Sequence, residues 1–508
     1  DEVHSLLRGD RGGQTLCLIE RLSRLSGSNP RRIGLSATIG DPNTVGALLS
    51  AGTNRTTIIP RFNEPKRTWR ISMEHFYTTG PQAPERDYAV ANADDVELVG
   101  VETVASRALP TAGKTGEKYS SDGQGRRILP IDGSKSHALD VPSDVAPRFA
   151  DPGYGYLFEY SRGKKCLIFA NSREEAEGIT TSLRSYCELR HEPDRFLIHH
   201  GNLSSTYRET AEELMKDDSF NLTTVTTATL ELGIDIGKLE RAFQVDAPFT
   251  VSSFLQRMGR TGRRDLPPEM WFVMREEEPE PRSLMPDTIP WKLLQGIALV
   301  QVYTEEKWVE PPRLDRLPYS LLYHQTMSTL ASCGELSPAQ LAERVLSLAY
   351  FHRISLDDYR VLLRHLLGTD QIQATEAGGL IVGLAGERIT NSFKFYAVFQ
   401  DDEEFSVRCE SQELGTVVLP PPPGERLAIA GHVWLVEEID RKRHLVYVSK
   451  VKGKVPAYFG ECAGDINTKI LERMRLALCE SHYYPYLMTN ARARLSLARR
   501  VAKNAGII

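Results

Sequence analysis

Between residues 164 and 275, short apolar segments alternate with segments of helical periodicity, and this alternation leaves few possible folds. The apolar segments have the length of strands and cover 166–170, 196–199, 222–227, 242–245 and 271–274. Helix-like segments lie between the first of them, at 173–186 and 205–216. Short apolar strands that alternate with helices form a parallel sheet covered on both faces. The sequence therefore predicts an α/β fold, with one complete parallel-sheet domain over 151–279.

A basic segment follows the fourth predicted strand. On a helix over 253–263, Gln256, Arg260 and Arg263 stand at positions i, i+4 and i+7, so three donors share one face. Two glycines inside such a helix each cost roughly 1 kcal/mol relative to alanine, which indicates a close approach to the backbone. Planar guanidinium groups suit phosphate oxygens, so this face is predicted to clamp a phosphoryl group. The alternative is a solvated basic helix capped by Ser253 and Gln256.

The first 79 residues have the pattern of the second half of another α/β domain. Residues 16–25 show helical periodicity, and 31–38 are predicted to be a short strand that ends in small hydroxyl residues. A third segment, 69–77, is also strand-like.

Residues 80–150 are polar and rich in Gly, Pro and Ser, which indicates an irregular insertion or linker. Within it, 108–115 resembles a phosphate-binding loop that ends in Gly113-Lys114-Thr115. Such a loop needs a helix directly after it, and the polar, glycine-containing residues that follow cannot form an amphipathic one. A chance match is therefore our interpretation. The alternative is a permuted motor, in which Lys114→Ala would abolish ATP hydrolysis.

Beyond residue 279 the pattern changes again. Three short helices followed by a hairpin-like stretch at 371–385 predict a winged helix, with a helical linker domain as the alternative. Strand-like alternation from 393 to 451, beginning with a strand at 393–400, predicts a small antiparallel β domain. The predicted parts are a linker with one helix, a winged-helix-like domain, a β-rich domain and two C-terminal helices, over 280–312, 313–386, 387–462 and 463–508.

Composition restricts the kind of partner and the compartment. The net charge of −5 means that any nucleic-acid site must be a local groove, because the molecule as a whole is not basic. The seven cysteines include no Cys-x-x-Cys pair, which argues against a zinc site and for reduced thiols in the cytoplasm. No apolar run approaches the ~18 residues of a membrane span, so no membrane partner is expected.

Five motifs occur in the order and spacing found in superfamily 2 helicases of the DEAD/DEAH type. They are Asp1-Glu2-Val3-His4, Ser36-Ala37-Thr38, His200-Gly201 with Arg208, Thr227 followed by GIDI at 233–236, and QRMGRTGR at 256–263. Three sequence segments resemble those of the large helicase-related (Lhr) family of DNA-dependent ATPases. They are LELGIDIG at 230–237, IHHGNLS at 198–204 and SFLQRMGRTGR at 253–263. This resemblance covers nearly the whole chain except 80–150.

The resemblance implies two RecA-like motor domains, the first incomplete over 1–79, followed by the winged helix, the β domain and the C-terminal helices. In that family a phosphate-binding loop lies upstream of the aspartate box. The chain is therefore expected to be an N-terminally truncated fragment that lacks this loop.

For catalysis, the resemblance implies ATP and Mg²⁺ as cofactors. Asp1 would hold Mg²⁺ through water, and Glu2 would orient and deprotonate the attacking water. Arginine fingers and a γ-phosphate contact would come from the second motor domain, as Arg260, Arg263 and Gln256. The nucleotide would also contact Gly233 and Asp235. Coupling of the nucleotide state to the motor would pass through His4, Ser36 and Thr38.

For nucleic acid, the resemblance implies contacts from His200, Gly201, Arg208, Thr227 and Arg257. The partner would be single-stranded DNA or a DNA/RNA hybrid, bound without sequence preference and in a salt-sensitive way. The family also implies 3′-to-5′ movement, in DNA repair or phage defence. A different class of function is the alternative: a nucleic-acid-binding scaffold with an inactive ATP site.

Overall fold

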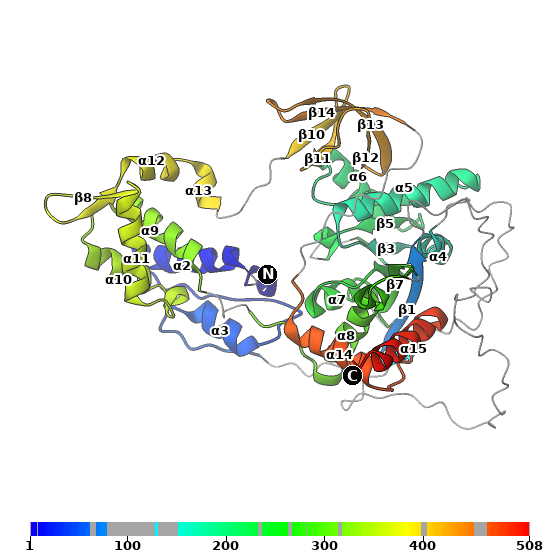
Figure 1. The fold of residues 1–508 in the computed structure, drawn as a ribbon. Helices are drawn as coiled ribbons and strands as arrows, with labels where there is room; N and C mark the ends of the chain where they lie inside the picture. Colours follow the sequence, from blue (N-terminus) through cyan, green and yellow to red (C-terminus); the bar gives the residue numbers. More distant parts are fainter. Residues whose placement is uncertain are drawn as a thin grey trace. The chain divides into compact units, whose positions relative to one another are not determined.

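The computed structural model divides the chain into two compact units, each described here by itself (Figure 1). Unit 1 combines residues 1–63 with 309–402, and unit 2 combines 64–308 with 403–508. The structure describes residues 2–7, 9–60, 68–78, 128–130, 151–231, 236–262, 267–280, 282–312, 317–397, 404–451 and 465–506.

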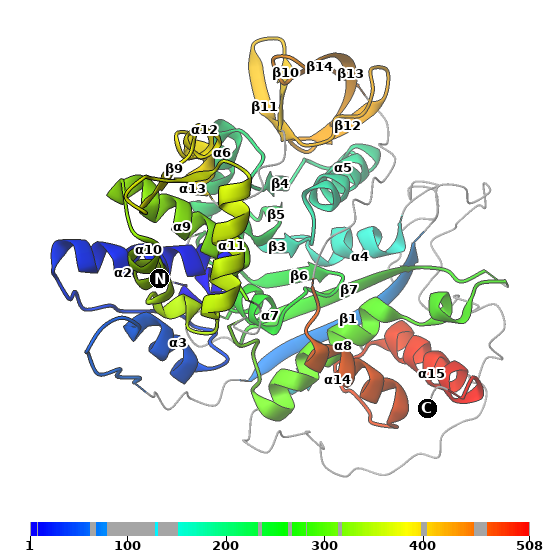
Figure 2. The same ribbon diagram turned by 60° about the vertical axis from the view of Figure 1, so that its left-hand side comes forward.

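Unit 2 is built on a seven-stranded sheet in the order β2-β1-β7-β6-β3-β5-β4, with all neighbouring strands parallel (Figure 2). Five of these strands, which lie between residues 166 and 277, match the five predicted strands and confirm the α/β fold with a parallel sheet. The strands are β1 (Trp69–Thr78), β2 (Ile128–Pro130), β3 (Cys166–Phe169), β4 (Phe196–His199), β5 (Thr223–Thr226), β6 (Arg241–Val245) and β7 (Glu269–Glu277).

The position of β1 corrects the predicted boundary at residue 79. This strand pairs with β7 from Arg70 opposite Glu269 onward, so it belongs to the sheet of unit 2 and not to the first domain. Ile71 and Met73 on β1 are fully buried. A parallel strand needs a neighbour far away in sequence, and local periodicity cannot say which domain supplies it.

Helices cover both faces of this sheet, and helix α5 shows why they form where they do. The Ser172 side chain accepts a hydrogen bond from the Glu175 N–H at 3.0 Å, which caps the first turn. Ala176, Ile179 and Leu183 then point into the core on one stripe. The helices around the sheet are α4 (Pro152–Tyr160), α5 (Arg173–Leu189), α6 (Ser205–Lys216), α7 (Val251–Met258) and α8 (Trp291–Glu306), with 3₁₀ turns η2 (Ala228–Leu230) and η3 (Met285–Thr288).

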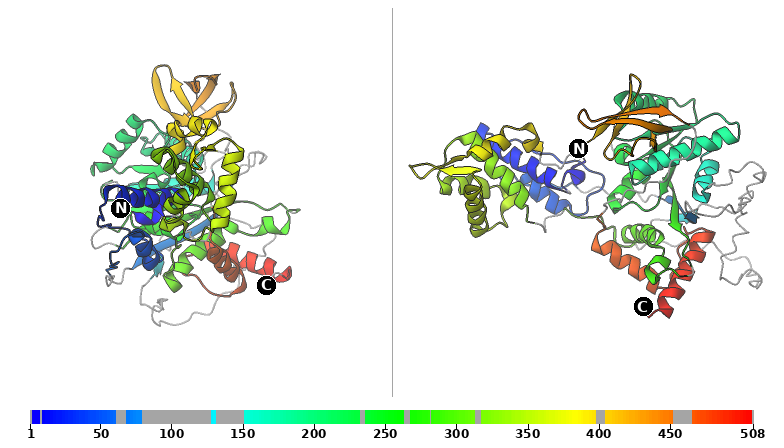
Figure 3. Two further views of the ribbon diagram at one scale, coloured as in Figure 1. Left: turned by 90° about the vertical axis from the view of Figure 1, so that its left-hand side faces the viewer. Right: turned by 45° about the horizontal axis from the view of Figure 1, so that its top comes forward.

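The two C-terminal helices, α14 (Thr468–Cys479) and α15 (Thr489–Asn504), lie beside α8 (Figure 3). Residues just before α15 also bind β1: the Met73 N–H donates to Tyr486 O, and the Met488 N–H donates to Met73 O, both at 2.9 Å. Helix α8 is buried along most of its length. The segment predicted as a linker therefore contributes to the core of unit 2, together with the C-terminal helices.

A second sheet in unit 2 has five strands in the order β11-β10-β14-β13-β12, and Figure 2 shows it curled into a ring. Every pairing is antiparallel except the one between β10 and β14. A small, mainly antiparallel β domain is thus present at the predicted place. Its strands are β10 (Phe405–Cys409), β11 (Gln412–Val417), β12 (Arg426–Ile429), β13 (His432–Asp440) and β14 (Leu445–Lys450).

Within unit 1, three helices over 319–368 and a hairpin over 372–382 follow one another in the order predicted for a winged helix. A capping box starts the helix Pro338–Leu346, because Ser337 and Gln340 exchange side-chain and backbone hydrogen bonds. The elements are α9 (Tyr319–Cys333), α10 (Pro338–Leu346), η4 (Ala349–Phe351), α11 (Leu356–Gly368), β8 (Ile372–Ala374), β9 (Leu380–Val382), α12 (Leu384–Thr390) and α13 (Phe393–Ala397).

Two predictions in this part of the chain are wrong. The strand expected at 393–400 is helix α13 over its described residues, and it packs in unit 1 through Phe395. The boundary at 387 therefore falls too early. The segment 31–38 is not a strand: among the described residues, its backbone-to-backbone hydrogen bonds are limited to the one from the Val3 N–H to Leu35 O at 3.1 Å.

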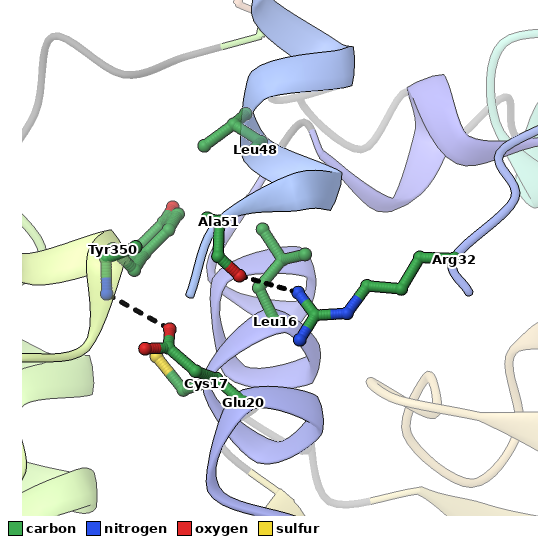
Figure 4. A pocket seen from close by; sticks show the side chains of 8 residues that line it. Leu16, Cys17, Glu20, Arg32, Leu48, Ala51 and Tyr350 are labelled. Atoms are coloured by element: carbon green, nitrogen blue, oxygen red, sulfur yellow. Dashed lines mark hydrogen bonds between the residues drawn. The ribbon is translucent and has the colours of Figure 1, made fainter. Parts of the chain in front are cut away.

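The remaining helices of unit 1 are α1 (Val3–Leu6), α2 (Asp10–Ser26) and α3 (Pro42–Ser50). Arg21 on α2 donates to Gln325 and Ser328 on α9, both at 3.0 Å. Figure 4 shows a small pocket lined by residues of α2, α3 and η4. At this pocket, Glu20 accepts a hydrogen bond from the Ala349 N–H, and Arg32 donates one to Ala51 O. Helix α2 is thus tied to the winged-helix elements by polar contacts.

Candidate nucleotide and nucleic-acid site

The carboxyl ends of the parallel strands in unit 2 meet at one edge of the sheet, where α/β proteins place their ligands. Polar residues follow four of these strands: Asn171 after β3, His199 and His200 at the end of β4, Thr227 after β5 and Asp246 after β6. The described residues among those predicted for the second motor domain lie in these connections, in α6 and α7, or in the turn after α7. This edge is the candidate site.

Arg257 forms the buried polar centre of this edge. Its guanidinium donates to Glu231 Oε1 and to Gln244 Oε1, both at 2.6 Å, and to Asn171 Oδ1 at 3.3 Å. Arg257 is 5% exposed and Glu231 6%. A guanidinium satisfied by protein groups on this scale is a structural anchor, and contact of Arg257 with nucleic acid stays a prediction.

Helix α7 is shorter than predicted. It ends at Met258, and Gly259 closes it, so Arg260 lies in the following turn instead of on the same helical face as Gln256. Gly262 has φ of 72°, and a Cβ there would come within 2.4 Å of Pro268 N. Gly259 therefore ends the helix, and Gly262 makes a tight turn that requires the conformational freedom of glycine. Gln256 and Arg260 are both half-buried.

Two adjacent histidines at the end of β4 are buried and paired with carboxylates. The ring of His199 lies 2.9 Å from Thr229 Oγ1 and 3.0 Å from Glu212 Oε1. Burial lowers the pKa of His199, while Glu212 acts in the opposite direction. His200 is 2% exposed, with Nε2 2.8 Å from Glu177 Oε1. Contact of His200 with nucleic acid stays a prediction; in this conformation its Nε2 faces Glu177.

The other residues predicted to contact nucleic acid lie at the accessible part of the edge. Gly201 is exposed, and a Cβ there would still be 4.0 Å from Thr229. Thr227 and Arg208 are half-buried. The Arg208 Nε is buried and has no hydrogen-bond partner among the described residues. An orphaned guanidinium N–H is a donor that suits a phosphate oxygen.

In unit 1 the structure brings the predicted coupling residues together. His4 Nδ1 lies 2.6 Å from Ser36 Oγ, and Ser36 Oγ accepts from the Thr38 N–H at 3.3 Å. His4 is also 3.3 Å from the carboxylate of Glu2. Glu2, His4, Ser36 and Thr38 thus form one connected polar group.

Four predicted site residues lie outside the described residues: Asp1, Gly233, Asp235 and Arg263. The loop-like segment at 108–115 lies outside them too. Among the residues that the structure does describe, no group of three or more His, Cys, Asp or Glu side chains could hold a metal ion. In the same part of the chain, no helix has both the length and the apolar character to cross a membrane.

Sequence reasoning missed Glu177, which sits on the buried face of α5 and partners His200. The signal was present, because Glu177 falls inside the apolar stripe of that helix next to Ala176. A carboxylate at a core position is almost never left unpaired, so it indicates a buried polar contact. Asn171, Glu231 and Gln244 were missed for lack of any comparable pattern.

Comparison with known proteins supports a helicase. The Helicase conserved C-terminal domain family matches residues 154–265. Lhr helicase/uracil glycosylase of Escherichia coli is 30% identical over 52% of this chain and 16% of its own length. Lhr helicase/probable uracil glycosylase of Mycolicibacterium smegmatis is 24% identical over 91% of this chain and 29% of its own length. ATP-dependent helicase Lhr-Core of Sulfolobus acidocaldarius is 24% identical over 91% of this chain and 46% of its own length.

Two solved structures share the fold. The Mycobacterium smegmatis helicase Lhr bound to ssDNA and AMP-PNP aligns with a TM-score of 0.50 at 22% identity, over 77% of this chain and 41% of that one. The DUF1998 helicase MrfA bound to DNA aligns with a TM-score of 0.51 at 16% identity, over 89% of this chain and 53% of the MrfA chain. The chain spans less than half the length of these three curated relatives. With the motifs and the parallel sheet, these matches support a superfamily 2 helicase similar to the Lhr relatives.

Proposed function

We propose that this chain is part of an ATP-dependent DNA helicase that moves 3′ to 5′ along a single strand, in DNA repair or phage defence. ATP hydrolysis would drive the movement, and a DNA/RNA hybrid is a second possible substrate. The relatives named Lhr-Core are ATP-dependent helicases, and the Lhr and MrfA structures hold DNA. Polarity and pathway rest on the family resemblance.

One observation carries the proposal: the anchored turn after α7. Arg257 fixes the end of α7 to the end of η2 through Glu231 and to β6 through Gln244, and Arg260 follows in a tight glycine turn. A rigid mount for a half-buried guanidinium is what electrostatic stabilisation of a transferring phosphoryl group requires. Arg260 would be the finger, with Arg263 beside it and Gln256 at the γ-phosphate.

The remaining roles are those that the family resemblance implies. Gly201, Arg208 and Thr227 would bind phosphates of the strand, with the orphaned Arg208 Nε as a donor. Gly233 and Asp235 would contact the nucleotide. ATP would bring Mg²⁺, for which carboxylate oxygens are the fitting ligands; Asp1 would hold it through water, next to the half-buried carboxylate of Glu2. The His4–Ser36–Thr38 group would relay the nucleotide state.

The Arg260→Ala variant tests the finger assignment. Loss of a finger should lower turnover by roughly 10³-fold or more while nucleotide and DNA affinity stay within a few-fold. Steady-state ATP hydrolysis with single-stranded DNA measures the first, and equilibrium binding measures the second. Arg500→Ala is the matched control, because Arg500 is an exposed arginine on α15. Normal hydrolysis by Arg260→Ala would refute the finger, and a wild type that binds DNA without hydrolysing ATP would favour the scaffold.

A further inference from the structure

The turn between β12 and β13 has all four of its backbone polar groups bound by one helix. Ala430 and Gly431, with φ of 56° and 71°, form the turn. The Glu177 carboxylate accepts from their two N–H groups at 2.8 and 2.7 Å. Arg184 donates to Gly431 O at 2.8 Å and to Ala430 O at 3.3 Å. Glu177 and Arg184 are seven residues apart on α5, so they share a face.

The same carboxylate holds the end of β4. Glu177 Oε1 also lies 2.8 Å from His200 Nε2, and both residues are almost fully buried. A buried carboxylate with three hydrogen-bonding neighbours is satisfied, and removal of its charge leaves those neighbours without a partner. Glu177 therefore connects the His200–Gly201 motif to the β domain.

A second connection lies directly after the motif. The Thr416 N–H donates to Asn202 O at 2.8 Å, and the Ser204 N–H donates to Leu414 O at 3.2 Å. Leu203 and Gly415 form the antiparallel bridge between these two bonds. Strand β11 thus pairs with the segment 202–204, so the β domain holds both sides of Gly201.

We propose that Glu177 is a positioning residue for the nucleic-acid strand. Through His200 and the turn at 430–431, it makes the β domain a rigid backing for the exposed segment at Gly201, so that backbone donors there are preset for a phosphate. The proposal rests on the function proposed above, since it concerns how the same edge grips the strand. Glu177 touches neither ATP nor the strand in this account.

The sign of the expected effect separates positioning from simple electrostatics. Glu177→Gln removes a negative charge near a polyanion binding site, which by Coulomb's law alone should leave DNA binding unchanged or tighten it. An amide keeps only one acceptor oxygen and presents a donor to one of the groups from which Glu177 accepts, so at least one of these bonds is lost. Positioning therefore predicts weaker DNA binding from a variant that has become less negative.

The test compares full-length wild type with Glu177→Gln, Gly415→Ala and the control Glu437→Gln. A Cβ at Gly415 would lie 2.2 Å from Asn202 O, so Gly415→Ala breaks the second connection while the Glu177 contacts remain. Glu437 is an exposed carboxylate on β13, so Glu437→Gln removes the same charge while the contacts of Glu177 remain. The readouts are the Kd for a fluorescent single-stranded oligodeoxynucleotide, the KM for DNA and the kcat of ATP hydrolysis, and amide hydrogen exchange over 201–204.

Glu177→Gln and Gly415→Ala should each raise the Kd and the KM for DNA by about tenfold. The kcat of ATP hydrolysis at saturating DNA should stay within about twofold of wild type, and amide hydrogen exchange at 201–204 should accelerate. Glu437→Gln should match wild type. If Glu177→Gln disrupts the whole fold, Gly415→Ala decides. If wild type binds DNA, and Glu177→Gln and Gly415→Ala bind it equally well or more tightly, this proposal alone is overturned. A wild type without DNA affinity overturns the proposed function as well.

Discussion

Neighbouring arginines in one short motif have opposite environments. Arg257 is enclosed by Glu231, Gln244 and Asn171, whereas Arg260 lies half-buried in a turn three residues later. Helical periodicity indicates that Arg257 points away from the face of Gln256, as it does. It does not reveal the partners of Arg257, because these come from strand connections far away in sequence. Burial of the charge could therefore be read only from the structure.

Arg257→Leu should destabilise the fold without acting as a DNA-contact variant. Removal of one partner from a buried pair leaves the Glu231 carboxylate uncompensated, which costs about 3–5 kcal/mol. Urea unfolding of the variant and wild type gives the difference in free energy of unfolding. A variant that keeps wild-type stability but loses DNA affinity would instead support direct contact of Arg257 with nucleic acid.

At the level of elements, sequence patterns predicted those that are defined by local periodicity. The strands from β3 to β7 and helices α5 and α6 appear where expected, because a parallel sheet with two covered faces requires continuous apolar strands. The failures all involve distant partners: β1 joined the sheet of unit 2, 31–38 formed no ladder, and α13 packed in unit 1.

The candidate site divides in the same way. Its residue types and chain order were evident from motifs, but the shorter α7, the burial of His200 and the role of Glu177 were not. The burial of His200 and the role of Glu177 depend on contacts across the fold, such as the pairing of the β12–β13 turn with α5. The end of α7 is set locally, by the turn at 259–262. A motif therefore located the edge of the sheet without showing which side chains face outward.

Docking of the β12–β13 turn should weaken in mild acid because of His432. Burial, together with the charge of Arg184 and of Lys450, lowers the pKa of His432 to about 4, against the smaller opposing effect of Asp194 and Glu177. Below the unperturbed value of about 6.5, the unfolded chain therefore binds more protons, and stability is lost as the pH falls toward 4.

Native-state hydrogen exchange over β12 and β13 at pH 7 and pH 5, corrected for the intrinsic exchange rates, measures this loss. Wild type should lose roughly 1–2 kcal/mol of protection, and His432→Asn, which does not titrate, should lose correspondingly less. An equal loss in both proteins would show that His432 does not control the pH dependence.

On the scale of the whole molecule, the described elements place a helicase-type parallel sheet, a curled β domain and helices of winged-helix type in one chain. The β domain is bound to the candidate edge of the sheet by α5 and by the segment 202–204. An accessory domain attached at this place should affect DNA affinity more than the chemistry of ATP. A helicase of this kind binds its strand mainly through phosphates, so the affinity should fall steeply with salt.

The most direct test of the central claim is ATP hydrolysis by the full-length protein in the presence of single-stranded DNA, single-stranded RNA and a DNA/RNA hybrid. The account predicts low basal turnover that single-stranded DNA raises strongly, with stimulation that declines as salt increases. Binding of DNA with no stimulated hydrolysis under any of these conditions would contradict it, and would identify the protein as a scaffold instead of a motor.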